Sequence, residues 1–141
     1  YPAGPNTYEQ HGRYQEALDE RRRQVARTMG ALAVVESSFD TGRPIDEVIG
    51  EQVKDGRISA EDAEGTAGEI RDLVHEAYAA ESADPDQANE RAQQTIDSYR
   101  AGAPVGKKGA RKIAQAGNAR IEELRTRVED AHKDVEFFAG Q

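Results

Sequence analysis

Cysteine and tryptophan are absent from this chain of 141 residues, and methionine occurs once. Without cysteine, the sequence excludes disulfide scaffolds, thiol catalysis and cysteine-ligated zinc. Long apolar runs are missing too, because the most apolar stretch, residues 31–35, is far shorter than the ~18 residues of a membrane-spanning helix. Hydrophobic residues make up 36% of the chain and aromatic residues 6%. A composition with so few hydrophobic and aromatic residues is typical of amphipathic helices, each of which buries only one stripe of its side chains.

The net charge of −8 is unevenly distributed. Residues 41–100 carry six Lys/Arg and fifteen Asp/Glu, a net of −9, whereas residues 101–141 carry eight and six, a net of +2. The simplest interpretation is an ordinary solvated surface. The alternative is that the basic segment contacts a partner or the acidic block of the same chain. Since the whole chain repels polyanions, we do not expect nucleic acid to be the partner.

Apolar and small side chains recur every three or four residues near the end of the chain. Between residues 122 and 134, every side chain off this stripe is polar or charged. The spacing predicts a helix over residues 110–138 that buries one narrow seam against another helix. The stripe consists of Ala114, Gly117, Ile121, Leu124, Val128, Ala131, Val135 and Phe138.

A second stripe with the same spacing predicts a helix over residues 8–39. Thr7 and Gln10 have the form of a capping box at its start, and Met29 lies beside the stripe as an alternative core contact. The stripe consists of Tyr14, Leu18, Arg21, Val25, Thr28, Leu32, Val35 and Phe39.

Turn and capping signals predict three shorter helices, over residues 44–54, 60–82 and 85–100. No segment shows the alternation of a strand. The sequence therefore predicts an all-α fold with one helical domain over residues 7–141, after an extended tail over residues 1–6. In this helical bundle the two long helices pair as a coiled-coil-like hairpin, with the three shorter helices between them.

Two carboxylate–histidine pairs with i, i+3 spacing resemble the ligand pattern of di-iron sites in helical bundles. Ligands in such bundles point inward, whereas both pairs here lie on polar flanks of the predicted apolar stripes. We therefore expect no metal site and no cofactor. The pairs are Asp72 with His75 and Glu129 with His132, and the further candidate ligands are Glu36 and Glu90.

Catalytic motifs are not apparent either. The segment from Gly102 to Lys108 is not a phosphate-binding loop, because it has three residues between its glycines instead of four and a lysine where the hydroxyl should be. No nucleophile signature accompanies the histidines. We therefore expect a non-enzymatic protein with no catalytic residues.

The most plausible function is a helical protein-interaction module whose partner is another protein or a second copy of the chain. The aromatic candidates for the contact are Phe137 and Phe138. Phe137 lies off the stripe that Phe138 continues, so one of the two should face away from the seam. An exposed aromatic side chain at a helix end would be a suitable anchor for a partner.

A cluster of cations supplies the charged candidates for the contact. Cations at a helix N-terminus oppose the helix dipole. Either the last helix starts later, near residue 110, or these cations form a contact surface for an acidic partner. The cluster consists of Lys107, Lys108, Arg111 and Lys112.

Two alternative functions stay open. The first is a bundle-type metal-binding protein or enzyme. The second is a helical substrate or chaperone of a bacterial secretion system. In size and helicity the chain is similar to substrates of actinobacterial type VII secretion, but it has no Trp-x-Gly turn and no Tyr-x-x-x-Asp/Glu signal. The chain begins at Tyr1 rather than at Met. We therefore expect part of a larger secreted or envelope-associated bacterial protein, and the sequence does not predict its localisation.

Overall fold

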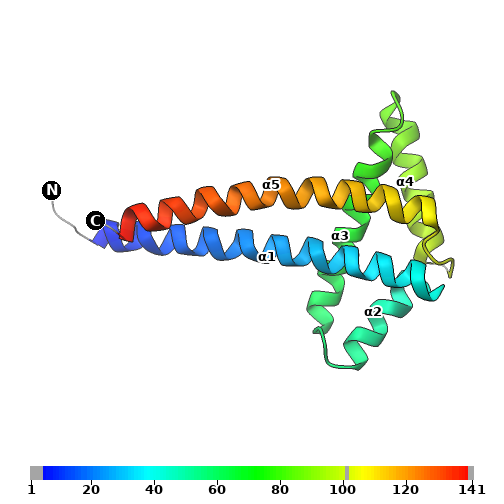
Figure 1. The fold of residues 1–141 in the computed structure, drawn as a ribbon, viewed down its shortest axis with the longest axis horizontal. Coiled ribbons are helices and arrows are strands. Elements are labelled where there is room, and N and C mark those ends of the chain that lie inside the picture. The colour runs from blue at the N-terminus through cyan, green and yellow to red at the C-terminus, as the bar shows by residue number, and fades with distance from the viewer. Residues whose placement is uncertain (1–4, 101, 140–141) are drawn as a thin grey trace. The chain divides into compact units, whose positions relative to one another are not determined.

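In the computed structural model, which describes residues 5–100 and 102–139, five α-helices and no strand are present (Figure 1). Most of the described residues are helical, and the long first and last helices pack closely. The all-α prediction, with two long helices and three shorter ones between them, is therefore confirmed. In chain order the helices are α1 (Pro5–Thr41), α2 (Ile45–Lys54), α3 (Ala60–Ala79), α4 (Pro85–Arg100) and α5 (Lys107–Ala139).

The two long helices start earlier than the sequence predicts. Helix α1 begins at Pro5, so residues 5 and 6 are helical rather than part of a tail, and Thr7 lies inside the helix instead of capping it. Proline suits this position, because its fixed φ and missing N–H fit the first helical turn. The rest of the predicted tail, residues 1–4, lies outside the described residues.

Helix α5 begins at Lys107, three residues before the predicted start. The carbonyl of Gly106 accepts a hydrogen bond from the amide of Ala110 at 2.8 Å, which closes the first turn. Two lysines therefore lie in a first turn that contains no acidic residue. The explanation that the helix starts only near residue 110 is therefore wrong.

Internal contacts divide the chain into two compact units, which we describe separately. Unit 1 comprises residues 1–26 and 120–141, and unit 2 comprises residues 27–119. Helices α1 and α5 contribute to both units. The expectation of a single domain over residues 7–141 stays a prediction.

In unit 1, the segments of α1 and α5 run antiparallel and enclose a narrow apolar seam (Figure 1). Leu18, Ile121 and Leu124 are buried. The rings of Tyr14 and Phe138 stack with their centroids 4.6 Å apart. The polar positions between the stripe residues of α5 are exposed, so the predicted stripe does face the seam.

The seam can be tested at Leu124, which is 7% exposed. We expect Leu124→Ala to lower the free energy of unfolding by about 2–5 kcal/mol, because it removes a buried side chain and leaves a cavity. The control is Glu123→Ala, which removes an exposed ion pair with Arg127 at 2.6 Å. Such i, i+4 pairs contribute only about 0.3–0.5 kcal/mol. Equal losses for the two variants in urea unfolding would contradict the assignment of this face.

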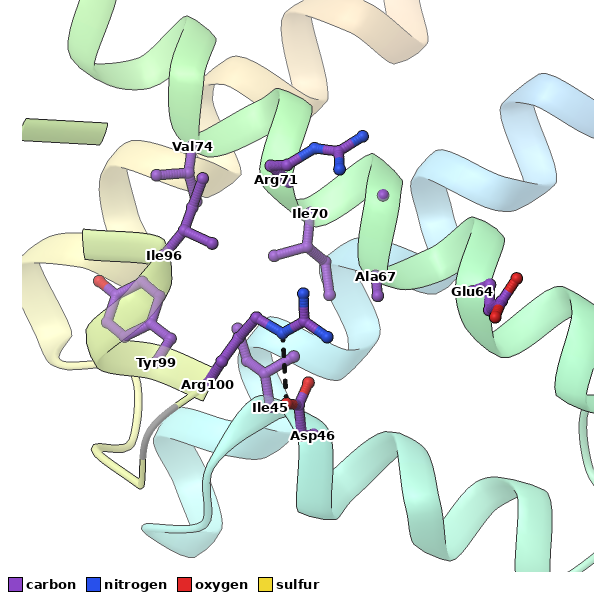
Figure 2. Close-up of a pocket in the computed structure, with 11 residues that line it drawn as sticks. Ile45, Asp46, Glu64, Ala67, Ile70, Arg71, Val74, Ile96, Tyr99 and Arg100 are labelled. Carbon is purple, nitrogen blue, oxygen red and sulfur yellow. Dashed lines mark hydrogen bonds and ion pairs between the residues drawn. The ribbon is translucent and has the colours of Figure 1, made fainter. Parts of the chain in front are cut away.

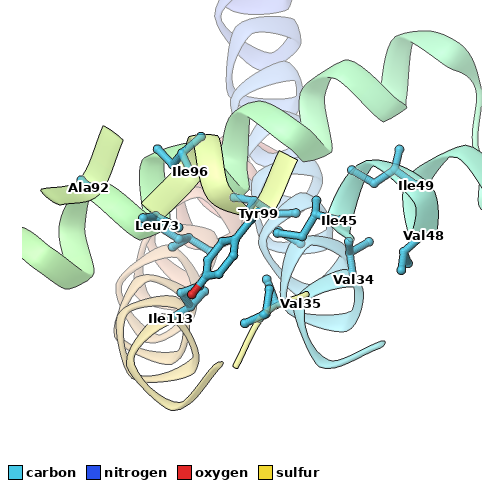
Figure 3. Close-up of a cluster of buried hydrophobic side chains, with 14 residues drawn as sticks. Val34, Val35, Ile45, Val48, Ile49, Leu73, Ala92, Ile96, Tyr99 and Ile113 are labelled. Carbon is cyan, nitrogen blue, oxygen red and sulfur yellow. The ribbon is translucent and has the colours of Figure 1, made fainter. Parts of the chain in front are cut away.

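Unit 2 has a broader core than the seam, because here α1 and α5 pack against the shorter helices as well as each other. Figure 3 shows this cluster, in which side chains from α1, α2, α3, α4 and α5 meet. Ile113 and Leu73 are fully buried in it. The other members are Ala31, Val34, Val35, Ile45, Val48, Ile49, Ile70, Val74, Ala92, Ile96, Tyr99 and Val105.

The buried face of α1 in unit 2 differs from the predicted stripe at several positions. Phe39, expected in the core, is 41% exposed, and Met29, the alternative core contact, is 50% exposed. Ala31 and Val34, which lie off the stripe, are buried instead. The buried face is wider because α1 has several packing partners here. Thr28 stays on the stripe as a buried polar residue, since its hydroxyl donates to Oε1 of Glu69 in α3 at 3.0 Å.

Gly117 marks a close approach of α1 and α5 within unit 2. A Cβ at this position would lie 2.5 Å from Cδ2 and 2.9 Å from Cγ of Leu32. Any side chain here would force the leucine out of its place, and such overpacking destabilises a core. The predicted stripe therefore contains a glycine because the leucine of the opposing helix occupies the space.

Ser38 is a fully buried polar residue near the end of α1. Its hydroxyl donates to the carbonyl oxygen of Arg43 at 2.6 Å and accepts from the amide of Val105 at 3.0 Å. The first bond fixes the turn that leads into α2, and the second fixes the segment that leads into α5. One side chain thus connects the chain segments that enter and leave the three shorter helices.

Candidate functional site

At one end of unit 1, three aromatic residues form a cluster that we call the aromatic end: Tyr14, Phe137 and Phe138. Phe138 stacks on Tyr14, and Phe137 meets the ring of Phe138 edge-on with centroids 5.3 Å apart. Phe137 is 63% exposed. As expected, one of the two phenylalanines faces away from the seam. Tyr8, in the same unit, is also exposed.

The members of the cation cluster at the start of α5 differ in burial, because one is paired within the fold and the others are exposed. Lys112 is mostly buried and forms an ion pair with Glu81, which follows α3. Its ammonium nitrogen also lies 5.0 Å from the ring centroid of Tyr78, within the range of a cation–π interaction. The members that remain exposed are Lys107, Lys108 and Arg111.

Glu81 connects the basic segment to the acidic block of the same chain. Its bond with Lys112 holds the pKa of the carboxyl group below its usual value, with smaller contributions from Arg91 and Lys108. The basic segment therefore contacts the acidic block of the same chain at this point, as one of the interpretations of the charge pattern expected. Lys112 is engaged in the fold and is a poor candidate for contact with a partner.

A cavity that the sequence did not predict lies in unit 2 among α2, α3 and α4. Its volume is about 230 Å³, and it opens to solvent. Figure 2 shows the side chains around it, with isoleucines from all three helices. The apolar part of its wall includes Ile45, Ile70, Val74 and Ile96, all of which also belong to the buried core.

Charged side chains of both signs line the mouth of the cavity. Nε of Arg100, at the end of α4, donates to Oδ2 of Asp46 in α2 at 3.2 Å. Arg71 and Glu64 come from α3. Sequence analysis could not find this site, because it combines residues from three helices. The one local signal is Gly68, an unexplained glycine in the interior of α3.

Tyr99 also lines the cavity and is 8% exposed. Its hydroxyl lies against Gly109 of α5, where a Cβ would clash with it. Burial raises the pKa of Tyr99 to about 12, and the neighbouring hydroxyl of Tyr78 adds to this. The ring therefore stays neutral in the folded chain well above the pH at which an exposed tyrosine ionises.

The raised pKa of Tyr99 predicts a loss of stability at alkaline pH. Its contribution is complete below pH ~10, the usual pKa, and disappears as pH approaches ~12, because only the unfolded chain releases the proton in this range. By pH ~11 the loss should reach about 1.4 kcal/mol. Thermal unfolding of wild type and Tyr99→Phe between pH 9 and 11 checks this. If both proteins lose the same stability over this range, Tyr99 is not the group responsible.

The histidine–carboxylate pairs do not assemble into a recognisable metal centre. Within residues 5–100 and 102–139, no group of three or more His, Asp or Glu side chains is placed to hold a metal ion. His132 instead lies 3.7 Å from Glu136, one turn further along α5.

Comparison with models of known protein families, with curated proteins and with solved structures found no match. Among the described helices, none combines the length and the apolar character required to cross a bilayer.

Proposed function

We propose that this chain is a helical protein-interaction module and that the aromatic end of unit 1 binds the partner, which is another protein or a second copy of the chain. The observation that carries the proposal is the exposure of Phe137 next to the stacked rings of Tyr14 and Phe138, which are only partly buried. Aromatic side chains contribute much of the affinity of protein interfaces, whereas exposed single charges contribute little.

The geometry of the aromatic end favours binding in a second way. Phe138 is held by its stack on Tyr14, and Phe137 packs edge-on against Phe138. Side chains that are already ordered lose less conformational entropy when a partner binds. The aromatic end is therefore a better anchor than the exposed lysines of α5, which are long and flexible.

A direct test compares wild type with Phe137→Ser. We expect the variant to lose self-association in sedimentation velocity, or to lose the protein that wild type captures from a cell extract. The expected weakening is about 10-fold to 100-fold, since truncation of an aromatic anchor costs about 1–3 kcal/mol. Circular dichroism should show an unchanged helix content, because Phe137 is exposed.

Two controls separate the aromatic end from other surfaces. Asp134→Ser changes an exposed residue one turn earlier on α5 and should bind as wild type does. Lys107→Glu/Lys108→Glu reverses two exposed cations in unit 2 and should bind as wild type does at both low and high salt. If Phe137→Ser and Asp134→Ser behave alike, the aromatic end is not the contact surface.

A further inference from the structure

The cavity of unit 2 has a hydrogen-bond donor at its mouth that the fold uses only in part. Figure 2 shows the guanidinium of Arg100 directed from α4 toward Ile70 and Ala67 of α3, across the cavity. Nε bonds to Asp46 at 3.2 Å. Within the part of the chain that the structure describes, the two Nη nitrogens form no hydrogen bond. Asp46 therefore orients the guanidinium and leaves Nη1 and Nη2 available to donate hydrogen bonds to a ligand.

The apolar wall of the cavity is fixed before any ligand binds. Ile45, Ile70 and Ile96 are 3%, 4% and 6% exposed, so each is already packed in the core. The volume of about 230 Å³ is larger than the ~150 Å³ cavity that accepts a benzene ring. Such a space suits a short aliphatic chain or a single aromatic ring.

Gly68 is the part of the cavity wall that has no side chain. A Cβ at Gly68 would meet only Nη2 of Arg71, at 3.8 Å, which is an ordinary van der Waals contact. The packing of α3 therefore does not require glycine, although glycine weakens a helix interior relative to alanine. Gly68 itself lines the cavity, so we expect a large side chain at this position to narrow it.

We propose that this cavity binds a small monocarboxylate with an apolar tail. The carboxylate accepts hydrogen bonds from Nη1 and Nη2 of Arg100, in the bidentate geometry that a guanidinium favours. The tail lies against Ile45, Ile70 and Ile96. A second charged group at the far end of the tail would lie against the apolar wall without a partner, so dicarboxylates are disfavoured. This inference does not rest on the proposed function, which concerns unit 1.

Octanoate is the probe, and isothermal titration calorimetry measures its affinity for the whole chain. Octanol has the same tail without the charge, and octanedioate adds a second carboxylate. We expect octanoate to bind with a Kd below about 1 mM, a value that its few atoms can supply. Octanol should bind at least about tenfold more weakly, which is the effect of losing one charged hydrogen bond. Octanedioate should also bind more weakly, because its second carboxylate would lie against the apolar wall without a partner. Equal affinity for octanoate and octanol overturns the proposal.

Three variants locate the site. Arg100→Gln should weaken octanoate binding at least about tenfold, and Gly68→Leu should abolish it by filling the cavity. Arg57→Gln changes an exposed arginine that does not line the cavity and should bind as wild type does. Because Arg100 is exposed, Arg100→Gln decides the question even if Gly68→Leu disturbs the fold. Unchanged binding by Arg100→Gln, or binding by a correctly folded Gly68→Leu, overturns the proposal.

Discussion

The hydroxyl of Ser38 is the contact on which the arrangement of the shorter helices depends. It is fully buried, donates to the carbonyl of Arg43 and accepts from the amide of Val105. Leaving a buried amide without a partner costs about 1–3 kcal/mol, so an apolar side chain cannot replace the hydroxyl. The two bonds fix where the chain enters α2 and where it enters α5. The cavity inherits its shape from these positions, because its walls are α2, α3 and α4.

The chain uses one kind of helical pattern for two kinds of packing. In unit 1, a single stripe meets a single partner helix, so an aromatic residue just off the stripe, Phe137, is left exposed. In unit 2, the same two helices also pack against the shorter ones, and the face of α1 widens to include Ala31 and Val34. Here the side chains do not fill all the space among the helices, and a cavity remains beside Arg100. The aromatic end of unit 1 and the cavity of unit 2 thus both arise where the helices leave side chains or space without a packing partner.

Local patterns predicted the helices well, because helix periodicity and capping are local properties. The stripe of α5 was visible in the sequence, and the turn and capping signals correctly placed the start of α4 at residue 85. The start of α5 could not be predicted, since its first-turn lysines oppose the helix dipole. The next turn of α5 carries Lys112, whose contact with Glu81 is distant in sequence. The cavity could not be predicted either, because no periodicity in one helix reveals how three helices meet.

Hydrogen exchange at the amide of Val105 tests the central claim that the Ser38 hydroxyl fixes these segments. In wild type, this amide should be protected from exchange, because its hydrogen bond to Ser38 is buried. In Ser38→Ala, its protection should fall by about tenfold or more, the equivalent of losing about 1.4 kcal/mol of local stability. Ser37→Ala, one residue earlier and only half-buried, should leave it unchanged. Equal protection of Val105 in wild type and Ser38→Ala would contradict the account.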